Sequence, residues 1–259
     1  MTGAATASTL LNPHPALQRI LMKRPRFLFL DAVHTLIGLR PSVHGFFTSI
    51  AESLGRNPDP QALQEALDKA YATVRQRLAG RADFSIDQKR ERSFWRSIDA
   101  EIFRDIGLGG RAEEAADKAF REFESGRHFH LLEETLPALE RIRAMGIRVG
   151  IVSNGTEGME RWMRSCPFAP LVEFILVSVV VGWEKPGPQI FRIALERAGV
   201  QPDEALHAGD SYEHDVQGAA SAGIPAVWIS PNGANRAADC PVLRHVGELP
   251  DFLAGLTGR

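Results

Sequence analysis

Short apolar runs alternate with amphipathic helical patterns along most of the chain. The apolar runs cover residues 27–30, 147–152, 174–181, 205–208 and 226–229. Each run is short enough to be a buried strand. Between them, helical spacing is clearest at Phe191, Ala194, Leu195 and Ala198, which fit an i, i+3, i+4, i+7 pattern closed by Gly199. Strands that alternate with helices predict an α/β fold with a Rossmann-like, doubly wound parallel sheet.

Residues 41–128 depart from this alternation. A helix is predicted to begin at Ser42 and end near Gly55, and helical spacing recurs over residues 63–78, 94–102 and 112–123. No convincing strand occurs between residues 58 and 128. A single crossover between parallel strands needs only about 30 residues, so this longer stretch predicts an inserted all-helical module. The predicted organisation is therefore a tail over 1–24, a core over 25–40 and 129–259, and a helical insertion over 41–128.

Composition and charge narrow the class of protein. The formal net charge is −2 over 259 residues, so no global basic field indicates nucleic acid. No apolar stretch reaches the length of a transmembrane helix, so no membrane partner is predicted. The two cysteines, Cys166 and Cys240, are too few for a disulfide framework, which favours a reducing compartment and a cytoplasmic location. The first 24 residues lack acidic side chains and are interpreted as a loosely attached tail, with a short helix over 16–22.

Polar residues stand where several predicted strands end. Asp31 follows the strand over 27–30, Ser153 and Asn154 follow the strand over 147–152, and Asp210 follows the strand over 205–208. The carboxyl ends of parallel strands meet at one edge of a sheet, where ligands bind. Facing carboxylates repel unless a cation lies between them, and Mg²⁺ prefers oxygen ligands. With Ser153 and Lys185 holding a phosphate, Asp31 can act as a carboxylate nucleophile.

Four segments in this order carry a resemblance to a known family. They are Asp31-Ala32-Val33-His34-Thr35-Leu36, Val152-Ser153-Asn154-Gly155, Glu184-Lys185-Pro186, and Gly209-Asp210-Ser211-Tyr212-Glu213-His214-Asp215. From about residue 26 to residue 252 the chain resembles the haloacid dehalogenase-like (HAD) hydrolase superfamily. The position of the insertion is similar to the subfamily with a C1 cap, and the motif details are similar to its HDHD3-like or REG-2-like group.

The resemblance implies a role for each matching residue. It makes Asp31 the nucleophile and Lys185 its catalytic partner, with Mg²⁺ as the cofactor. The implied substrate-binding residues are Thr35, Ser153, Asn154 and Lys185. The implied metal ligands are Asp31, the backbone carbonyl of Val33, Asp210 and Asp215. The cap would close over the site and select the substrate.

One position departs from the family pattern. Family phosphatases usually carry an aspartate as general acid and base two residues after the nucleophile, where this chain has Val33. Such a group typically contributes about 10²–10⁴-fold to the rate.

Three hypotheses therefore stay open. The chain is a Mg²⁺-dependent hydrolase of a small phosphorylated substrate, in which His34, a cap residue or the substrate replaces the missing acid. Alternatively it is a dehalogenase acting on an organic acid, although Asp210 argues against halide chemistry, or a phosphonatase, for which Lys69 and Lys89 are the candidates for a Schiff-base lysine. The third is a catalytically weak phosphate-binding protein. The sequence names no substrate and leaves monomer and homodimer equally open.

Overall fold

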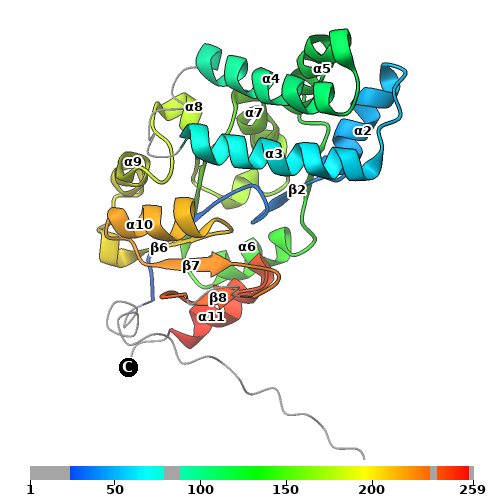
Figure 1. Cartoon of the computed structure of the whole chain (residues 1–259). Coiled ribbons are helices and arrows are strands. Elements are labelled where there is room, and N and C mark those ends of the chain that lie inside the picture. The colour runs from blue at the N-terminus through cyan, green and yellow to red at the C-terminus, as the bar shows by residue number, and fades with distance from the viewer. Residues whose placement is uncertain (1–23, 79–87, 234–237, 257–259) are drawn as a thin grey trace, which may run out of the picture.

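The computed structural model describes residues 24–78, 88–233 and 238–256 (Figure 1). Six parallel strands form one sheet in the order β5-β4-β1-β6-β7-β8. The strands are β1 (Phe27–Leu30), β4 (Arg148–Ser153), β5 (Phe174–Val177), β6 (Ala205–Gly209), β7 (Ala226–Ile229) and β8 (Val242–Leu243). The predicted Rossmann-like α/β class is confirmed. The predicted tail, with its helix over 16–22, lies outside the described residues except for Arg24.

Helices cover both faces of the sheet. Leu28 and Leu30 of β1 pack into one cluster, and Phe27 and Phe29 pack into another on the opposite face. The first cluster includes residues of α6 (Thr135–Ala144), α7 (Glu157–Ser165) and α11 (Leu249–Gly255). The second includes residues of α9 (Pro188–Ala198) and α10 (Gly218–Ser221). All four β1 side chains are fully buried, which explains why this strand is an unbroken apolar run rather than an alternating one.

In the described part of the chain, four α-helices lie between two short strands that are not part of the main sheet. They are α2 (Val43–Ser53), α3 (Pro60–Leu78), α4 (Gln88–Asp105) and α5 (Ala112–Glu124). We call these four helices the cap. They share a hydrophobic cluster of their own, which includes Phe47, Leu67, Ile98 and Phe103. In Figure 1 the cap forms a layer above the sheet. The strands β2 (Ile37–Leu39) and β3 (Phe129–Leu131) pair antiparallel at the points where the chain enters and leaves it. The boundaries at residues 41 and 128 stay a prediction.

Two predicted elements have bounds that differ from the sequence prediction. The strand predicted over 174–181 ends at Val177, because its neighbour β4 ends at the paired residue Ser153. Beyond that point no strand partner continues the ladder, and the chain turns into the helix α8 (Ser178–Val181). The helix predicted over 214–222 begins earlier, as the π-helix η5 (Tyr212–Gln217), and continues as α10.

The remaining elements are single-turn 3-10 helices over Gly109–Arg111, Ala169–Leu171, Pro202–Glu204 and Val246–Glu248. Within the described ranges, no helix is both long and apolar enough to cross a membrane. The cytoplasmic location and the choice between monomer and homodimer stay predictions.

Candidate active site

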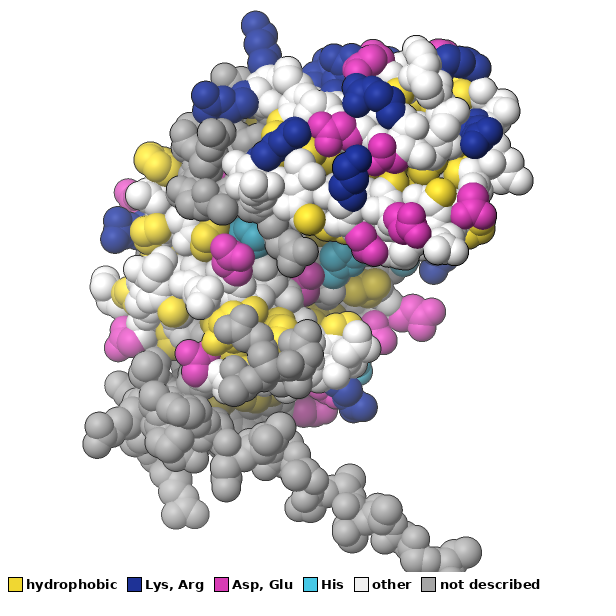
Figure 2. Space-filling model, viewed as in Figure 1, with side chains coloured by type: hydrophobic (Ala, Val, Ile, Leu, Met, Phe, Trp, Pro, Cys, Tyr) yellow, Lys and Arg dark blue, Asp and Glu magenta, His cyan; other side chains and the backbone are white. Residues whose placement is uncertain are grey.

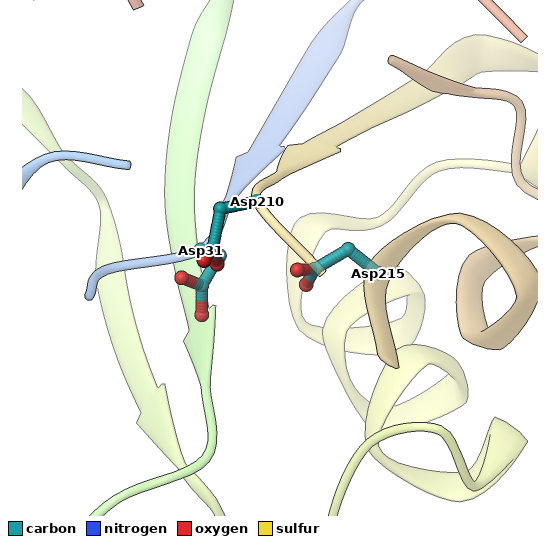
Figure 3. Close-up of side chains that lie close together, drawn as sticks. All are labelled: Asp31, Asp210 and Asp215. Atoms are coloured by element: carbon teal, nitrogen blue, oxygen red, sulfur yellow. The ribbon is translucent and has the colours of Figure 1, made fainter. Parts of the chain in front are cut away.

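Three neighbouring strands bring the predicted site residues together at one edge of the sheet. Strand β1 lies between β4 and β6, so Asp31 follows the central strand, Ser153 ends one neighbour and Asp210 follows the other. The backbone N–H of Asp31 donates to the carbonyl of Ala208 at 2.9 Å and extends the ladder to β6. Carboxylate oxygens of Asp31, Asp210 and Asp215 all lie within 4.8 Å of one another. Figure 3 shows Asp215 pointing from η5 towards the other two.

Lys185 lies buried between two of these carboxylates. Its Nζ donates to Oδ1 of Asp31 and to Oδ1 of Asp215, each at 2.6 Å, and its side chain is only 3% exposed. Burial alone would lower the pKa of Lys185, but the charges of Asp215 and Asp31 outweigh it and raise the pKa above the ordinary value. Lys185 is therefore an ammonium that is held between two anions.

The amide of Asn154 fixes the backbone of Lys185. Its Nδ2 donates to the carbonyl of Lys185, and its Oδ1 accepts from the N–H of Lys185, both at 2.8 Å. Asn154 borders the cavity, but both polar ends of its side chain are engaged in this pair of bonds. In this structure the residue predicted to bind substrate therefore positions the lysine.

Asp215 is buried and accepts hydrogen bonds at both oxygens. Oδ1 receives Lys185 and the Nε2 of His207 at 2.9 Å, and Oδ2 receives the N–H of Ser211 at 2.9 Å. Burial opposes the charge, but Lys185 and His207 outweigh it, so the pKa of Asp215 lies well below its usual range. An added Cβ at Gly209 would lie 2.2 Å from the carboxyl carbon of Asp215, so glycine is required there.

The sequence analysis did not identify His207. This histidine is fully buried in β6, and Phe191 packs edge-on against its ring. The available signal was a single polar side chain inside the apolar strand over 205–208. A buried polar group needs a partner, and here that partner is Asp215.

Asp31 has one carboxylate oxygen engaged and one free. Oδ1 accepts from Lys185 and from the hydroxyl of Ser153 at 3.0 Å. In the described part of the chain, Oδ2 accepts no hydrogen bond, and Asp31 borders the cavity. Thr35, in contrast, is fully buried and is not part of the described cavity wall. Ser153 thus contacts Asp31, the predicted nucleophile, whereas Thr35 is buried behind the cavity wall.

The charges at this edge do not balance without a further cation. Three carboxylates face one ammonium, which leaves about two negative charges. Burial, together with the charges of Asp31 and Asp215, raises the pKa of Asp210 to about 7. Oxygen donors and two excess negative charges fit Mg²⁺. Because both oxygens of Asp215 are already engaged, the carboxylates best placed to hold the ion are those of Asp31 and Asp210.

A cavity of about 830 Å³ extends from this cluster into the cap. On the core side, Val33 and His34 border it beside Asp31. His34 has a φ of 60°, a left-handed conformation that is uncommon for a residue other than glycine. Figure 2 shows histidine side chains at the boundary between the cap and the sheet domain below it. On the cap above this boundary, basic and acidic side chains are interspersed. The cavity can therefore receive a ligand that reaches Asp31 at one end and the cap helices at the other.

The cap contributes no described lysine to this cavity wall. Lys69 pairs at the surface with Asp105, with 2.7 Å between Nζ and Oδ2. Lys89 is likewise not part of the described wall. The geometry gives no support to a Schiff-base lysine at either position.

Comparisons with known proteins agree with this arrangement. The sequence model of the haloacid dehalogenase-like hydrolases matches residues 7–223. The chain is 26% identical to haloacid dehalogenase-like hydrolase domain-containing protein 3 of Bos taurus, over 90% of this chain and 97% of that protein. It is 31% identical to a phosphoserine phosphatase of Thermus thermophilus, over 74% of this chain and 78% of that protein.

Solved structures share the fold. A 2-haloacid dehalogenase from Pseudomonas syringae superposes with a TM-score of 0.61 at 26% identity, covering 89% of this chain and 99% of that one. The HAD hydrolase YfnB from Bacillus subtilis, solved with magnesium, superposes with a TM-score of 0.74 at 19% identity, covering 89% and 99%. The predicted resemblance, including the HDHD3-like group, is confirmed. The chain, with its motifs at the ends of β1, β4 and β6, is a hydrolase that belongs to the haloacid dehalogenase-like family.

Proposed function

We propose that this hydrolase is a magnesium-dependent phosphatase that cleaves a small phosphorylated compound through an aspartyl-phosphate at Asp31. The observation that carries the proposal is the state of the Asp31 carboxylate. Lys185 and Ser153 donate to Oδ1, and Asp31 borders the cavity together with Asp210. Relatives named as phosphatases also support it, such as the phosphoserine phosphatase above and the human N-acylneuraminate-9-phosphatase, 31% identical over 60% of this chain and 66% of that protein.

The chemistry needs two displacements at phosphorus. In the first, Oδ2 of Asp31 forms a bond to phosphorus, the ester P–O bond breaks, and the leaving oxygen takes a proton to depart as an alcohol. In the second, water forms a bond to phosphorus and releases a proton, the bond between phosphorus and Oδ2 of Asp31 breaks, and inorganic phosphate leaves with the Asp31 carboxylate regenerated. Lys185 and the Ser153 hydroxyl donate to Asp31 in the resting site and are placed to donate to phosphoryl oxygens afterwards.

Magnesium would be held by Asp31, Asp210 and the carbonyl of Val33. It would supply neutralisation of the phosphate charge. Asp215 and His207 would act mainly through Lys185, because Oδ1 of Asp215 already accepts from Lys185 and His207 and Oδ2 accepts from the N–H of Ser211.

A direct test measures two products in parallel. We expect phosphate release from para-nitrophenyl phosphate with magnesium, and its loss after chelation and dialysis. Chloride release from a chlorinated organic acid is measured in the same samples. Chloride release without any phosphate release would contradict the proposal and favour dehalogenation.

Magnesium is expected to stabilise the protein more at alkaline pH than at acidic pH. Without metal, Asp210 has a pKa raised to about 7, so its protonated form stabilises the fold below its ordinary pKa of 3.8. That contribution is lost as the pH rises through about 7, where magnesium takes the place of the proton. Thermal unfolding with and without magnesium at about pH 5.5 and about pH 8 measures the difference.

The pH effect should depend on Asp210 itself. Asp210→Asn is expected to remove the pH dependence of the magnesium shift. Asp203→Asn, an exposed aspartate in the 3-10 helix before β6, is the control and should keep it. An equal magnesium shift at both pH values in the unaltered protein would show that Asp210 does not hold the ion.

Val33→Asp is expected to raise the turnover of alkyl phosphates by about 100-fold, at the lower end of what general acid catalysis contributes. Val33 borders the cavity two residues after Asp31, so a carboxyl group there could protonate the leaving oxygen. Aryl phosphates, whose leaving groups need less protonation, should gain less. The measurement is kcat for one alkyl and one aryl phosphate.

Val33→Asn is the matched control, because asparagine has nearly the same size but cannot transfer the proton. Equal rates for the Asp and Asn variants would show that leaving-group protonation does not limit turnover. In that case a group already present, with His34 the nearest candidate, supplies the proton.

A further inference from the structure

The cap end of the cavity is an apolar chamber, and the described part of its wall carries one charged side chain. Among the described lining residues of α2 to α5, the charged one is Asp99. Its apolar surroundings on the cavity wall include Phe47, Leu67, Trp95, Ile98, Ile102 and Phe120. Most of these belong to the hydrophobic cluster of the cap, so the chamber reaches into the cap interior. An acidic group at such a position is costly unless a partner compensates its charge.

The position of Asp99 on α4 directs it to this chamber. Trp95, Asp99 and Ile102 are spaced i, i+4 and i+7, so they share one face of the helix, and all three border the cavity. Asp105, on the same helix, is exposed and pairs with Lys69. In the described ranges of the chain, no Lys, Arg or His forms an ion pair with Asp99. The side chain thus faces the cavity, and none of the described residues supplies it with a compensating charge.

Burial raises the pKa of Asp99 to about 7, as expected for a carboxyl group that is largely removed from water. A ligand with a positive charge would restore the ionised form and gain a charge-assisted hydrogen bond. The other end of the same cavity holds Lys185 and Ser153, which would suit a phosphate once magnesium offsets the carboxylates of Asp31 and Asp210. The two ends therefore have opposite preferences, separated by an apolar wall.

We propose that Asp99 binds a cationic nitrogen of the substrate. The substrate class is then a phosphomonoester whose organic part is apolar and carries an ammonium group. This inference rests on the proposed phosphatase function, because the phosphate at Asp31 fixes which end of the substrate reaches the cap. A cavity of about 830 Å³ is large enough for such a molecule, since ligand pockets usually measure about 300–1,000 Å³.

The test compares three substrates with one carbon skeleton. They are the phosphate ester of phenylalaninol, the analogue without the amino group, and the analogue with a hydroxyl in its place. We expect the amine to be preferred in kcat/KM by roughly 10- to 100-fold over the other two, which is the range for a hydrogen bond to a charged group. Asp99→Asn should abolish the preference and leave the rate on the deaminated analogue within about threefold of the unaltered protein.

Asp105→Asn is the matched control, since it makes the same change on the same helix at an exposed site, and it should keep the preference. No preference in the unaltered protein, a preference for the hydroxyl analogue, or an amine preference that survives Asp99→Asn would each overturn the proposal.

A binding measurement separates this inference from the phosphatase proposal. Calorimetry on the Asp31→Asn protein, with and without Asp99→Asn, compares binding of the same three phosphates without turnover. If no ester is hydrolysed but the amine binds tightest and only while Asp99 is present, the phosphatase proposal fails and Asp99 keeps its role. If the esters are hydrolysed but bind equally well, the role of Asp99 fails alone.

Discussion

Asp31→Asn is expected to reduce phosphate ester hydrolysis by at least about 10³-fold, because the amide cannot attack phosphorus. Asparagine occupies the same volume and keeps an oxygen that can accept from Ser153 and Lys185, so the fold is expected to persist. The measurement is the rate of para-nitrophenyl phosphate hydrolysis with magnesium, together with the thermal unfolding temperature. A loss of activity with an intact fold would identify Asp31 as the group that reacts.

The control for this variant is Asp203→Asn, an exposed aspartate that lies outside the cavity. It should leave hydrolysis unchanged. If Asp31→Asn instead keeps activity within about tenfold of the unaltered protein, the covalent route through Asp31 is wrong.

Lys185→Met is expected to have the second large effect, on stability as well as activity. Removing the ammonium leaves Asp31 and Asp215 buried without their shared cation, and breaking a buried ion pair in this way costs about 3–5 kcal/mol. Typical domains have only about 5–15 kcal/mol of unfolding free energy in total. Urea denaturation of the metal-free protein at neutral pH measures the loss, and hydrolysis assays measure the accompanying loss of rate.

Neutral pH is suitable because both partners are ionised there. The pKa of Lys185 is raised above its ordinary 10.5, so its contribution is fully present below that pH and is lost as the pH rises through the raised value. The pKa of Asp215 is lowered below its ordinary 3.8, so its contribution is present above that pH and is lost as the pH falls through the lowered value. The ion cluster therefore stabilises the fold over a wide range around neutrality.

Lys69→Met provides the comparison. Lys69 also pairs with an aspartate, at 2.7 Å from Asp105, but its side chain is 63% exposed. Exposed pairs of this kind contribute little, so this variant should unfold almost as the unaltered protein does. A similar loss of stability in both variants would show that burial does not make the ion pairs of Lys185 more stabilising than an exposed pair.

Strands that are buried on both faces of the sheet could be predicted from the sequence, because they are unbroken apolar runs. The strand over 27–30 was readable because Phe27 and Phe29 pack on one face of the sheet and Leu28 and Leu30 on the other. The short strands β2 and β3 were missed. Three residues are too few to show an alternation of apolar and polar side chains, and the two strands pair although they are far apart in the sequence. The helix α8 was missed because its valines favour a strand, and only the end of β4 stops the ladder.

The same distinction applies to the site. Convergence of Asp31, Ser153 and Asp210 followed from parallel topology, which fixes where strand ends meet. The bonds of Asn154 to the backbone of Lys185, and of His207 to Asp215, depend on side-chain direction, which sequence spacing does not set. Asp99 likewise reads as an ordinary polar residue on a helix until the cavity beside it is known.

We propose that Asp31 and Asp210 hold a magnesium ion beside a carboxylate that takes up a phosphoryl group. The most direct measurement is a crystal structure of the protein grown with magnesium and beryllofluoride, which mimics a phosphoryl group on a carboxylate. We expect the beryllium on Oδ2 of Asp31, with magnesium in contact with Asp31, Asp210 and the carbonyl of Val33. Magnesium bound elsewhere, or beryllofluoride absent from Asp31 while it occupies another side chain, would contradict the account.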